Sequence, residues 1–217
     1  MARSAADSLE DFFKAFPALL GRTATATERN AFGRYANLLV LWNRTHHLTA
    51  LKTRADIARV LFLDSLLWRS LLPREPLRIL DIGAGAGIPG IPLRMVDPSI
   101  ALTLIESRRK PVSFLHALIR ELALDIALHH GRAEAISSQV PELQGKFDVV
   151  LTRAVGRGSQ VIEMAAPYLR RGGTVIASGP PVARAMPKVE WPNAGWNKVE
   201  FSGLGLARAF LVATIRD

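Results

Sequence analysis

The stretch Ile79-Leu80-Asp81-Ile82-Gly83-Ala84-Gly85-Ala86-Gly87-Ile88-Pro89-Gly90 decides the fold of this chain. It begins as a short apolar run, continues with a glycine at alternate positions, and reaches prolines that suit the first turn of a helix. The apolar run predicts a buried strand. Glycines after the strand let the backbone approach a ligand because they have no Cβ atom. The stretch therefore predicts a strand, a ligand-binding loop and a helix.

Further apolar runs follow, and helical patterns separate them. The runs cover residues 101–105, 125–129, 147–151 and 173–177, and the clearest helix between them covers residues 109–122. This alternation predicts an α/β fold with a mostly parallel sheet and helices on both faces. The end of the chain differs, because residues 196–200 and 209–215 predict a late strand pair around a glycine-containing loop.

The first 72 residues predict helices. Apolar side chains recur at helical spacing within residues 7–16, 28–42 and 56–72. Thr27 is placed to cap the second of these helices. Prolines 73 and 76 end the pattern. We expect a helical N-terminal segment over residues 1–75 and a ligand-binding domain over residues 76–217.

The composition is that of a globular protein, with 49% hydrophobic and 22% charged residues among 217. No apolar run reaches the roughly 18 residues that a membrane span needs, and the first residues lack the apolar core of a secretory signal. We therefore expect a cytoplasmic protein that does not enter a membrane. The absence of cysteine excludes disulfides, thiolate metal sites and cysteine nucleophiles. Four of the five histidines form adjacent pairs, which do not share a helix face, and we expect no metal site.

The chain is basic, with 28 lysines and arginines against 19 acidic residues and a net charge of +9. Such an excess favours a polyanionic partner such as nucleic acid. The charges are spread along the chain, so a solvated basic surface explains them equally well.

Two acidic residues separate the possible ligands of the glycine loop. Gly85, Gly87 and Gly90 satisfy the dinucleotide pattern G-x-G-x-x-G, which is weak by itself. Asp81 would repel a pyrophosphate but could accept a hydrogen bond from a methionine ammonium, which favours S-adenosylmethionine. Glu106 ends the next predicted strand, about 20 residues on, where an acid binds ribose hydroxyls in both classes of enzyme. The alternative is a helix-capping aspartate and a surface glutamate.

Two later segments reach the same edge of the predicted sheet. The loop that contains Ala133 and Glu134 follows the third strand, where backbone groups of this fold commonly lie against an adenine. Arg153 follows the fourth strand at the carboxyl edge, where ligands of open α/β sheets bind. A solvent-exposed arginine is the alternative for Arg153.

The loop from Asp81 to Pro92 resembles that of the glucose-inhibited division protein B family, whose members methylate guanine N7 in bacterial small-subunit ribosomal RNA. The resemblance covers most of the chain. Its other motifs are Leu41–Arg44, His47–Thr49, Leu63–Ser65, Ser113–Leu115, Glu121–Leu122, Arg132–Glu134, Phe147–Asp148 and Arg153–Ala154. The resemblance implies a Rossmann-like class I methyltransferase domain that uses S-adenosyl-L-methionine and acts on 16S ribosomal RNA or the small ribosomal subunit. It implies a cofactor pocket made by Gly83, Gly85, Gly87, Ile88, Glu106, Ala133, Glu134 and Arg153.

The chain departs from the family pattern at a few positions. The family commonly has histidine at Leu61, lysine at Ser178, and histidine at Ala209. These are positions that could face the RNA or the base. The resemblance therefore supports the methyl-donor site more strongly than the acceptor site.

Basic residues provide candidates for RNA contacts. They are Arg44, Lys52, Arg54, Lys110 and Arg208, with Arg108 and Arg109 beside Lys110. No residue is assigned as a catalytic acid or base, because guanine N7 already carries a free lone pair. Two alternatives to an RNA methyltransferase stay open: an enzyme acting on a small molecule or with NAD, and a catalytically silent module that binds the cofactor.

Overall fold

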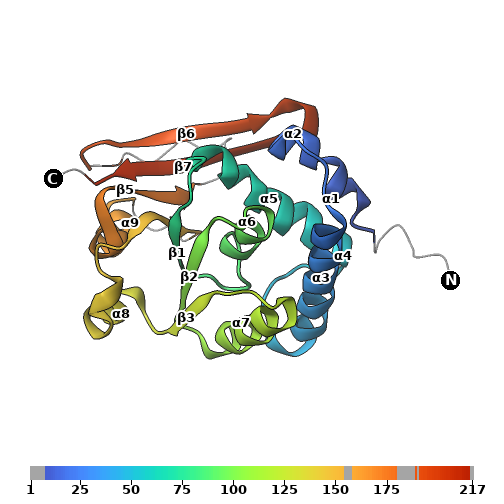
Figure 1. Cartoon of the computed structure of the whole chain (residues 1–217), viewed down its shortest axis with the longest axis horizontal. Coiled ribbons are helices and arrows are strands. Elements are labelled where there is room, and N and C mark those ends of the chain that lie inside the picture. Colours follow the sequence, from blue (N-terminus) through green and yellow to red (C-terminus); the bar gives the residue numbers. More distant parts are fainter. Residues whose placement is uncertain (1–7, 154–157, 180–188, 190, 216–217) are drawn as a thin grey trace.

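The computed structural model describes residues 8–153, 158–179, 189 and 191–215. Within these residues, seven strands form one sheet in the order β3-β2-β1-β4-β5-β7-β6 (Figure 1). The strands are β1 (Arg78–Ile82), β2 (Ala101–Glu106), β3 (Ala127–His130), β4 (Phe147–Thr152), β5 (Leu169–Ser178), β6 (Ala194–Phe201) and β7 (Leu206–Thr214). The predicted strands and the late strand pair are all present.

The first five strands run parallel, and β7 runs antiparallel to both β5 and β6. The chain order reverses beside β1, which has β2 on one side and β4 on the other. Open α/β sheets bind ligands at the carboxyl ends of the strands beside such a reversal. The glycine loop follows β1 at this point.

Helices cover both faces of the sheet. They are α1 (Glu10–Lys14), α2 (Phe16–Leu20), α3 (Ala26–His46), α4 (Arg54–Ile57), α5 (Leu63–Leu67), α6 (Gly90–Val96), α7 (Arg109–Leu122), α8 (Ala133–Gln139) and α9 (Gly158–Ala165). In Figure 1, α3, α5, α6 and α7 lie on one side of the sheet, and α8 and α9 lie on the other. None of the helices in the described part of the chain combines the length and apolarity that a bilayer crossing demands.

Two hydrophobic clusters hold these layers together. One joins the N-terminal helices to the sheet through residues such as Phe32, Phe114 and Leu104. The other lies on the opposite face of the sheet and includes Ile162 of α9 and Val150 of β4. The N-terminal helices and the sheet thus share one continuous core. The boundary between residues 75 and 76 stays a prediction.

One local prediction in the N-terminal part is wrong. The cap of α3 is Thr25 rather than Thr27: the Glu28 N–H donates to the Thr25 hydroxyl (3.2 Å), and the Thr25 N–H donates to the Glu28 carboxylate (2.7 Å). This reciprocal pair requires the glutamate three residues after the cap, which only Thr25 satisfies.

The third predicted helix is present, although it is not α-helical throughout. It begins at Arg54, widens into a π-helical turn over Ala58–Phe62, and ends in a 3-10 turn over Trp68–Leu71. Apolar spacing detects the buried face but not such changes in hydrogen bonding.

Candidate active site

Asp81 lies at the end of β1 and is completely buried. Its Oδ2 atom accepts a hydrogen bond from the Gly90 N–H (2.9 Å), at the start of α6. Its Oδ1 atom is buried, and the structure gives it no hydrogen-bond partner. Buried polar atoms without a partner are rare in folded proteins. One carboxylate oxygen therefore caps the helix, as the alternative interpretation expected, and the other is buried without a hydrogen-bond partner.

The surroundings of Asp81 disfavour its charged form. Burial raises the pKa of Asp81 to about 7, although the Gly90 N–H and the positive charge of Arg153 act in the opposite direction. A cation brought next to Oδ1 would restore the charged form. The position thus suits an ammonium group.

Gly90 and Gly87 must be glycines for reasons of space. A Cβ atom on Gly90 would lie 2.8 Å from Oδ2 of Asp81, and one on Gly87 would lie 2.7 Å from the Ile91 side chain and 2.9 Å from the Tyr35 hydroxyl. Gly87 also has φ +85°. Gly87 therefore packs the loop against α3 and α6, whereas Gly83 and Gly85 line the hollows described below.

Glu106 ends β2 and is 2% exposed. Its carboxylate accepts hydrogen bonds from the N–H groups of Gly85 (2.8 Å) and Arg108 (2.8 Å). The side chain of Arg108 adds a contact at 3.2 Å. Glu106 thus ties the glycine loop to the loop after β2, and its carboxylate lies between the two segments that would flank a ribose.

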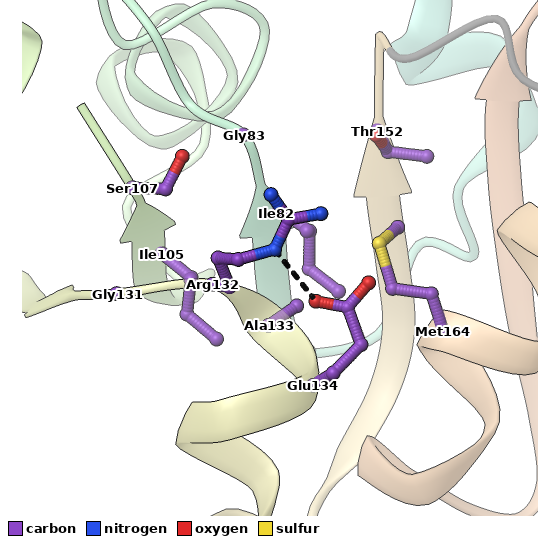
Figure 2. Close-up of a pocket in the computed structure, with 10 residues that line it drawn as sticks. All are labelled: Ile82, Gly83, Ile105, Ser107, Gly131, Arg132, Ala133, Glu134, Thr152 and Met164. Atoms are coloured by element: carbon purple, nitrogen blue, oxygen red, sulfur yellow. Dashed lines mark ion pairs between the residues drawn. The ribbon is translucent and has the colours of Figure 1, made fainter.

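The first hollow lies between the carboxyl ends of β1, β2 and β4 and the start of α8 (Figure 2). Its volume is about 180 Å³. It is lined by Ile82, Gly83, Ile105, Ser107, Gly131, Arg132, Ala133, Glu134, Thr152 and Met164. Figure 2 shows the Met164 sulfur and the Ile105 side chain on opposite sides of it, with the Arg132–Glu134 ion pair (3.7 Å) at its mouth. Apolar walls with nearby backbone groups suit a flat heterocycle such as adenine.

The second hollow lies on the other side of Gly83 and has a volume of about 350 Å³. It is lined by Leu48, Thr49, Leu61, Gly83, Ala84, Gly85, Ala86, Ile88 and Arg153. Because Gly83 borders both hollows, a ligand with two parts could occupy them together. The N-terminal segment supplies one wall, of which the sequence indicates only Leu61 as a position that could face the RNA or the base.

The N-terminal segment is held against the loop by residues that the sequence analysis missed. Tyr35 is completely buried, and its hydroxyl donates a hydrogen bond to the Ala86 carbonyl oxygen. The side chain of Asn43 accepts from the Thr49 N–H (2.9 Å) and donates to the Leu51 carbonyl (2.9 Å). The sequence pattern places Tyr35 only within an apolar helix and Asn43 only within a family motif. A polar side chain on the buried face of a helix was the available signal.

Two of the predicted RNA-binding residues, Arg44 and Lys110, lie close to the carboxyl edge of the sheet. Helices α3 and α7 run antiparallel, since Arg34 pairs with Glu121 and Trp42 packs on Phe114. Exposed Arg44 and Lys110 therefore lie at the same end of this helix pair, beside the carboxyl edge of β2.

Exposed Arg109 is next to Lys110, and exposed Lys52 follows the Asn43-bound loop. Arg54 is half-buried, and its Nε atom has no hydrogen-bond partner. Arg208, on β7, binds Asp64. Arg44, Lys52 and Lys110 are thus exposed, whereas Arg54 is half-buried and Arg208 is paired with Asp64 but keeps 31% of its side chain exposed.

The positions that depart from the family pattern differ in their surroundings. Leu61 is 8% exposed and lines the second hollow. Ser178 ends β5, where its hydroxyl donates to the Arg153 carbonyl (3.3 Å), and Ala209 is buried in β7. Because Leu61 borders the second hollow, the departure at Leu61 bears most directly on the acceptor.

Comparison with known proteins gives a match over most of the chain. Residues 28–179 match the family model of GidB, rRNA small subunit methyltransferase G. The chain is 39% identical over 160 residues to ribosomal RNA small subunit methyltransferase G of Streptococcus suis, an alignment that covers 72% of this chain and 67% of the relative.

Solved structures share the fold at low sequence identity. A putative O-methyltransferase from Klebsiella pneumoniae has a TM-score of 0.57 and 16% identity, with 95% of this chain and 97% of that chain covered. A fibrillarin from Aeropyrum pernix with natively bound S-adenosyl-L-methionine has a TM-score of 0.50 and 17% identity, with 66% and 69% covered. These similarities confirm the predicted Rossmann-like class I methyltransferase fold.

Proposed function

This chain belongs to the rRNA small subunit methyltransferase G family, and we propose that it transfers a methyl group from S-adenosylmethionine to guanine N7 in 16S ribosomal RNA. The observation that carries the proposal is the unpartnered, buried Oδ1 atom of Asp81 beside the glycine loop. An atom of this kind is matched by an ammonium group and not by a pyrophosphate. Family and site therefore favour the methyl donor over a nicotinamide dinucleotide.

The residues of the site fit S-adenosylmethionine in two parts. The hollow with Ile105, Ala133 and Met164 would hold the adenine, and Glu106 lies where it could bind the ribose. The hollow with Ile88 and Arg153 would hold the amino acid part, whose ammonium would face Asp81 and whose carboxylate would face the guanidinium.

The chain's contribution to the reaction is positioning. When bound, the cofactor supplies an electrophilic methyl group. Guanine N7 needs no base because its lone pair is free. Aligning two reactants can contribute up to about 7–11 kcal/mol. The N-terminal wall of the second hollow, with Leu48, Thr49 and Leu61, would place the acceptor base.

The exposed basic residues at the carboxyl edge would bind the RNA backbone. Arg44, Lys52 and Lys110 lie where a polyanion can reach them beside the site. Phosphate contacts of this kind make affinity fall with salt. Action on the small ribosomal subunit would place the protein in the cytoplasm.

Transfer of tritiated methyl from S-adenosylmethionine tests the proposal. Naked 16S RNA, small subunits and assembled ribosomes are each incubated with the chain, and the labelled nucleoside is identified by mass. We expect 7-methylguanosine in at least one of these substrates. Label in another base would overturn the guanine N7 assignment. Tight cofactor binding without label in any substrate would favour the silent module instead.

A further inference from the structure

We propose that Asp64 is a positioning residue: it orients Arg208 at the carboxyl edge of the sheet for contact with the RNA, and it leaves the neighbouring Arg153 free to turn to the cofactor. The inference rests on the proposed function. It concerns a carboxylate of the N-terminal helices that the sequence analysis placed only within a family motif.

The carboxylate of Asp64 is buried, with 7% of its side chain exposed, and it faces two guanidinium groups. Its Oδ1 atom accepts from Arg208 Nε (2.7 Å) and Nη2 (2.5 Å). Its Oδ2 atom lies 3.9 Å from Arg153 Nη2. Asp64 therefore holds Arg208 through two short contacts and Arg153 through one long one.

The topology brings both arginines to the carboxyl edge of the sheet. Arg153 directly follows β4, and Arg208 lies near the start of β7. Because β7 runs antiparallel to β5 and pairs Phe210 with Ser178, its first residues lie beside the carboxyl end of β5. Asp64 reaches this edge from α5, so it bridges the helical layer and two strands.

Both guanidinium groups of this cluster stay partly accessible. Two guanidinium groups share one carboxylate, and the side chains of Arg153 and Arg208 remain 36% and 31% exposed. Charge-assisted contacts orient a guanidinium strongly. Arg208 is thus oriented with part of its surface open to an anion, as an RNA phosphate requires. Arg153 is held loosely and lines the second hollow, so it can turn to a ligand carboxylate without losing a strong pair.

If Asp64 positions Arg208, its removal should change the KM for the RNA and not kcat. In Asp64→Asn the shape is kept and the charge is lost, so Arg208 is held less firmly. We expect the KM for the RNA substrate to rise about tenfold, a loss of about 1.4 kcal/mol, while kcat at saturating RNA stays within about twofold. A merely structural role would lower the melting temperature and the active fraction and leave this KM unchanged, and that result would overturn the inference.

The matched control is Asp148→Asn. Asp148 pairs with Arg170 Nε at 2.5 Å, but at the amino end of β4, on the opposite edge of the sheet. The substitution Asp148→Asn therefore removes a comparable ion pair that lies far from the site. We expect its KM for RNA to equal that of the wild type, and an equal rise in both variants would contradict a specific role for Asp64.

A double-mutant cycle tests the link to Arg208. If Asp64 acts through Arg208, Asp64→Asn added to Arg208→Ala should raise the KM no further. Additive effects would overturn the inference. Should Asp64→Asn fail to fold, Arg208→Lys serves instead, because it keeps the charge and loses the Nε contact. A raised KM in Arg208→Lys would support positioning, and an unchanged KM would contradict it. Labelling by the wild-type chain, measured first, tests the proposed function separately.

Discussion

The hydroxyl of Tyr35 donates a hydrogen bond to the carbonyl oxygen of Ala86, in the middle of the glycine loop. Tyr35 lies on α3, and the pair joins the N-terminal helices to the loop after β1. A second tyrosine does the same on the other side of the site, since the Tyr168 hydroxyl donates to the Ala133 carbonyl (2.5 Å). Each of the two backbone segments that would contact the cofactor is thus fixed by a buried phenol.

We expect Tyr35→Phe to destabilise the chain by about 1–3 kcal/mol, because the buried Ala86 carbonyl loses its donor. The cofactor affinity should fall several-fold as the loop loosens. Urea denaturation and calorimetry measure the two effects. Ser70→Ala is the control, since this hydroxyl donates to the Leu67 carbonyl away from both hollows. Unchanged cofactor affinity in Tyr35→Phe would show that the bond does not shape the loop.

Cofactor binding should depend on pH through Asp81. Its pKa is raised to about 7 by burial, so below pH 7 a proton must leave before the carboxylate can pair with an ammonium. Above about pH 8 the α-amino group itself loses its charge. We therefore expect the tightest binding between about pH 7 and 8, and affinity about fivefold weaker at pH 6 than at pH 7.5.

Calorimetry over this pH range checks the effect of Asp81. Methylthioadenosine is the matched ligand, because it has the adenosine part without the ammonium, and its affinity should stay flat. Asp81→Ala should weaken S-adenosylmethionine and remove the pH dependence. A flat profile for the full cofactor in the wild type would exclude contact between Asp81 and the ammonium.

Two glycine substitutions should act in opposite directions. In Gly90→Ala the new Cβ atom meets Oδ2 of Asp81 at 2.8 Å, so the carboxylate must move and both stability and cofactor affinity should fall. In Gly33→Ala, inside α3, the nearest atom would be 3.6 Å away on Arg54, and the helix should gain about 0.5–1 kcal/mol. Thermal unfolding with and without cofactor compares them. Equal melting temperatures of the two variants, with and without cofactor, would mean that the close contact between residue 90 and Asp81 does not affect stability or cofactor binding.

Salt dependence should identify the RNA face. Lys110→Ala and Arg44→Ala each remove an exposed cation at the carboxyl edge, and each should lower the slope of log affinity against log salt by about 1. Lys146→Ala is the control, because exposed Lys146 precedes β4 at the opposite edge. Filter binding with 16S RNA gives the slopes. If Lys146→Ala alone lowered the slope, the RNA would bind at the opposite edge of the sheet and the prediction would be wrong.

The local sequence around Asp81 was enough to predict the strand, the loop and the helix, because apolar runs and glycines act over a few residues. Glu106, Ala133 and Arg153 could be predicted as neighbours since parallel strands deliver their ends to one edge. The same reasoning failed for Thr27, where a reciprocal hydrogen bond between Thr25 and Glu28 determined the cap. It did not indicate the π-helical turn after α4, because apolar spacing marks the buried face of a helix and not its hydrogen-bond pattern.

The sequence by itself determined the α/β class, the glycine loop and the identity of its acidic partners, since each follows from patterns within one segment. Only the tertiary structure decided that Tyr35 holds Ala86, that Asn43 folds Thr49 over the second hollow, and that Asp64 joins Arg153 to Arg208. These contacts link residues distant in the chain, and the free energy that forms them comes from packing the helical layer on the sheet. No periodicity within one segment reports such packing.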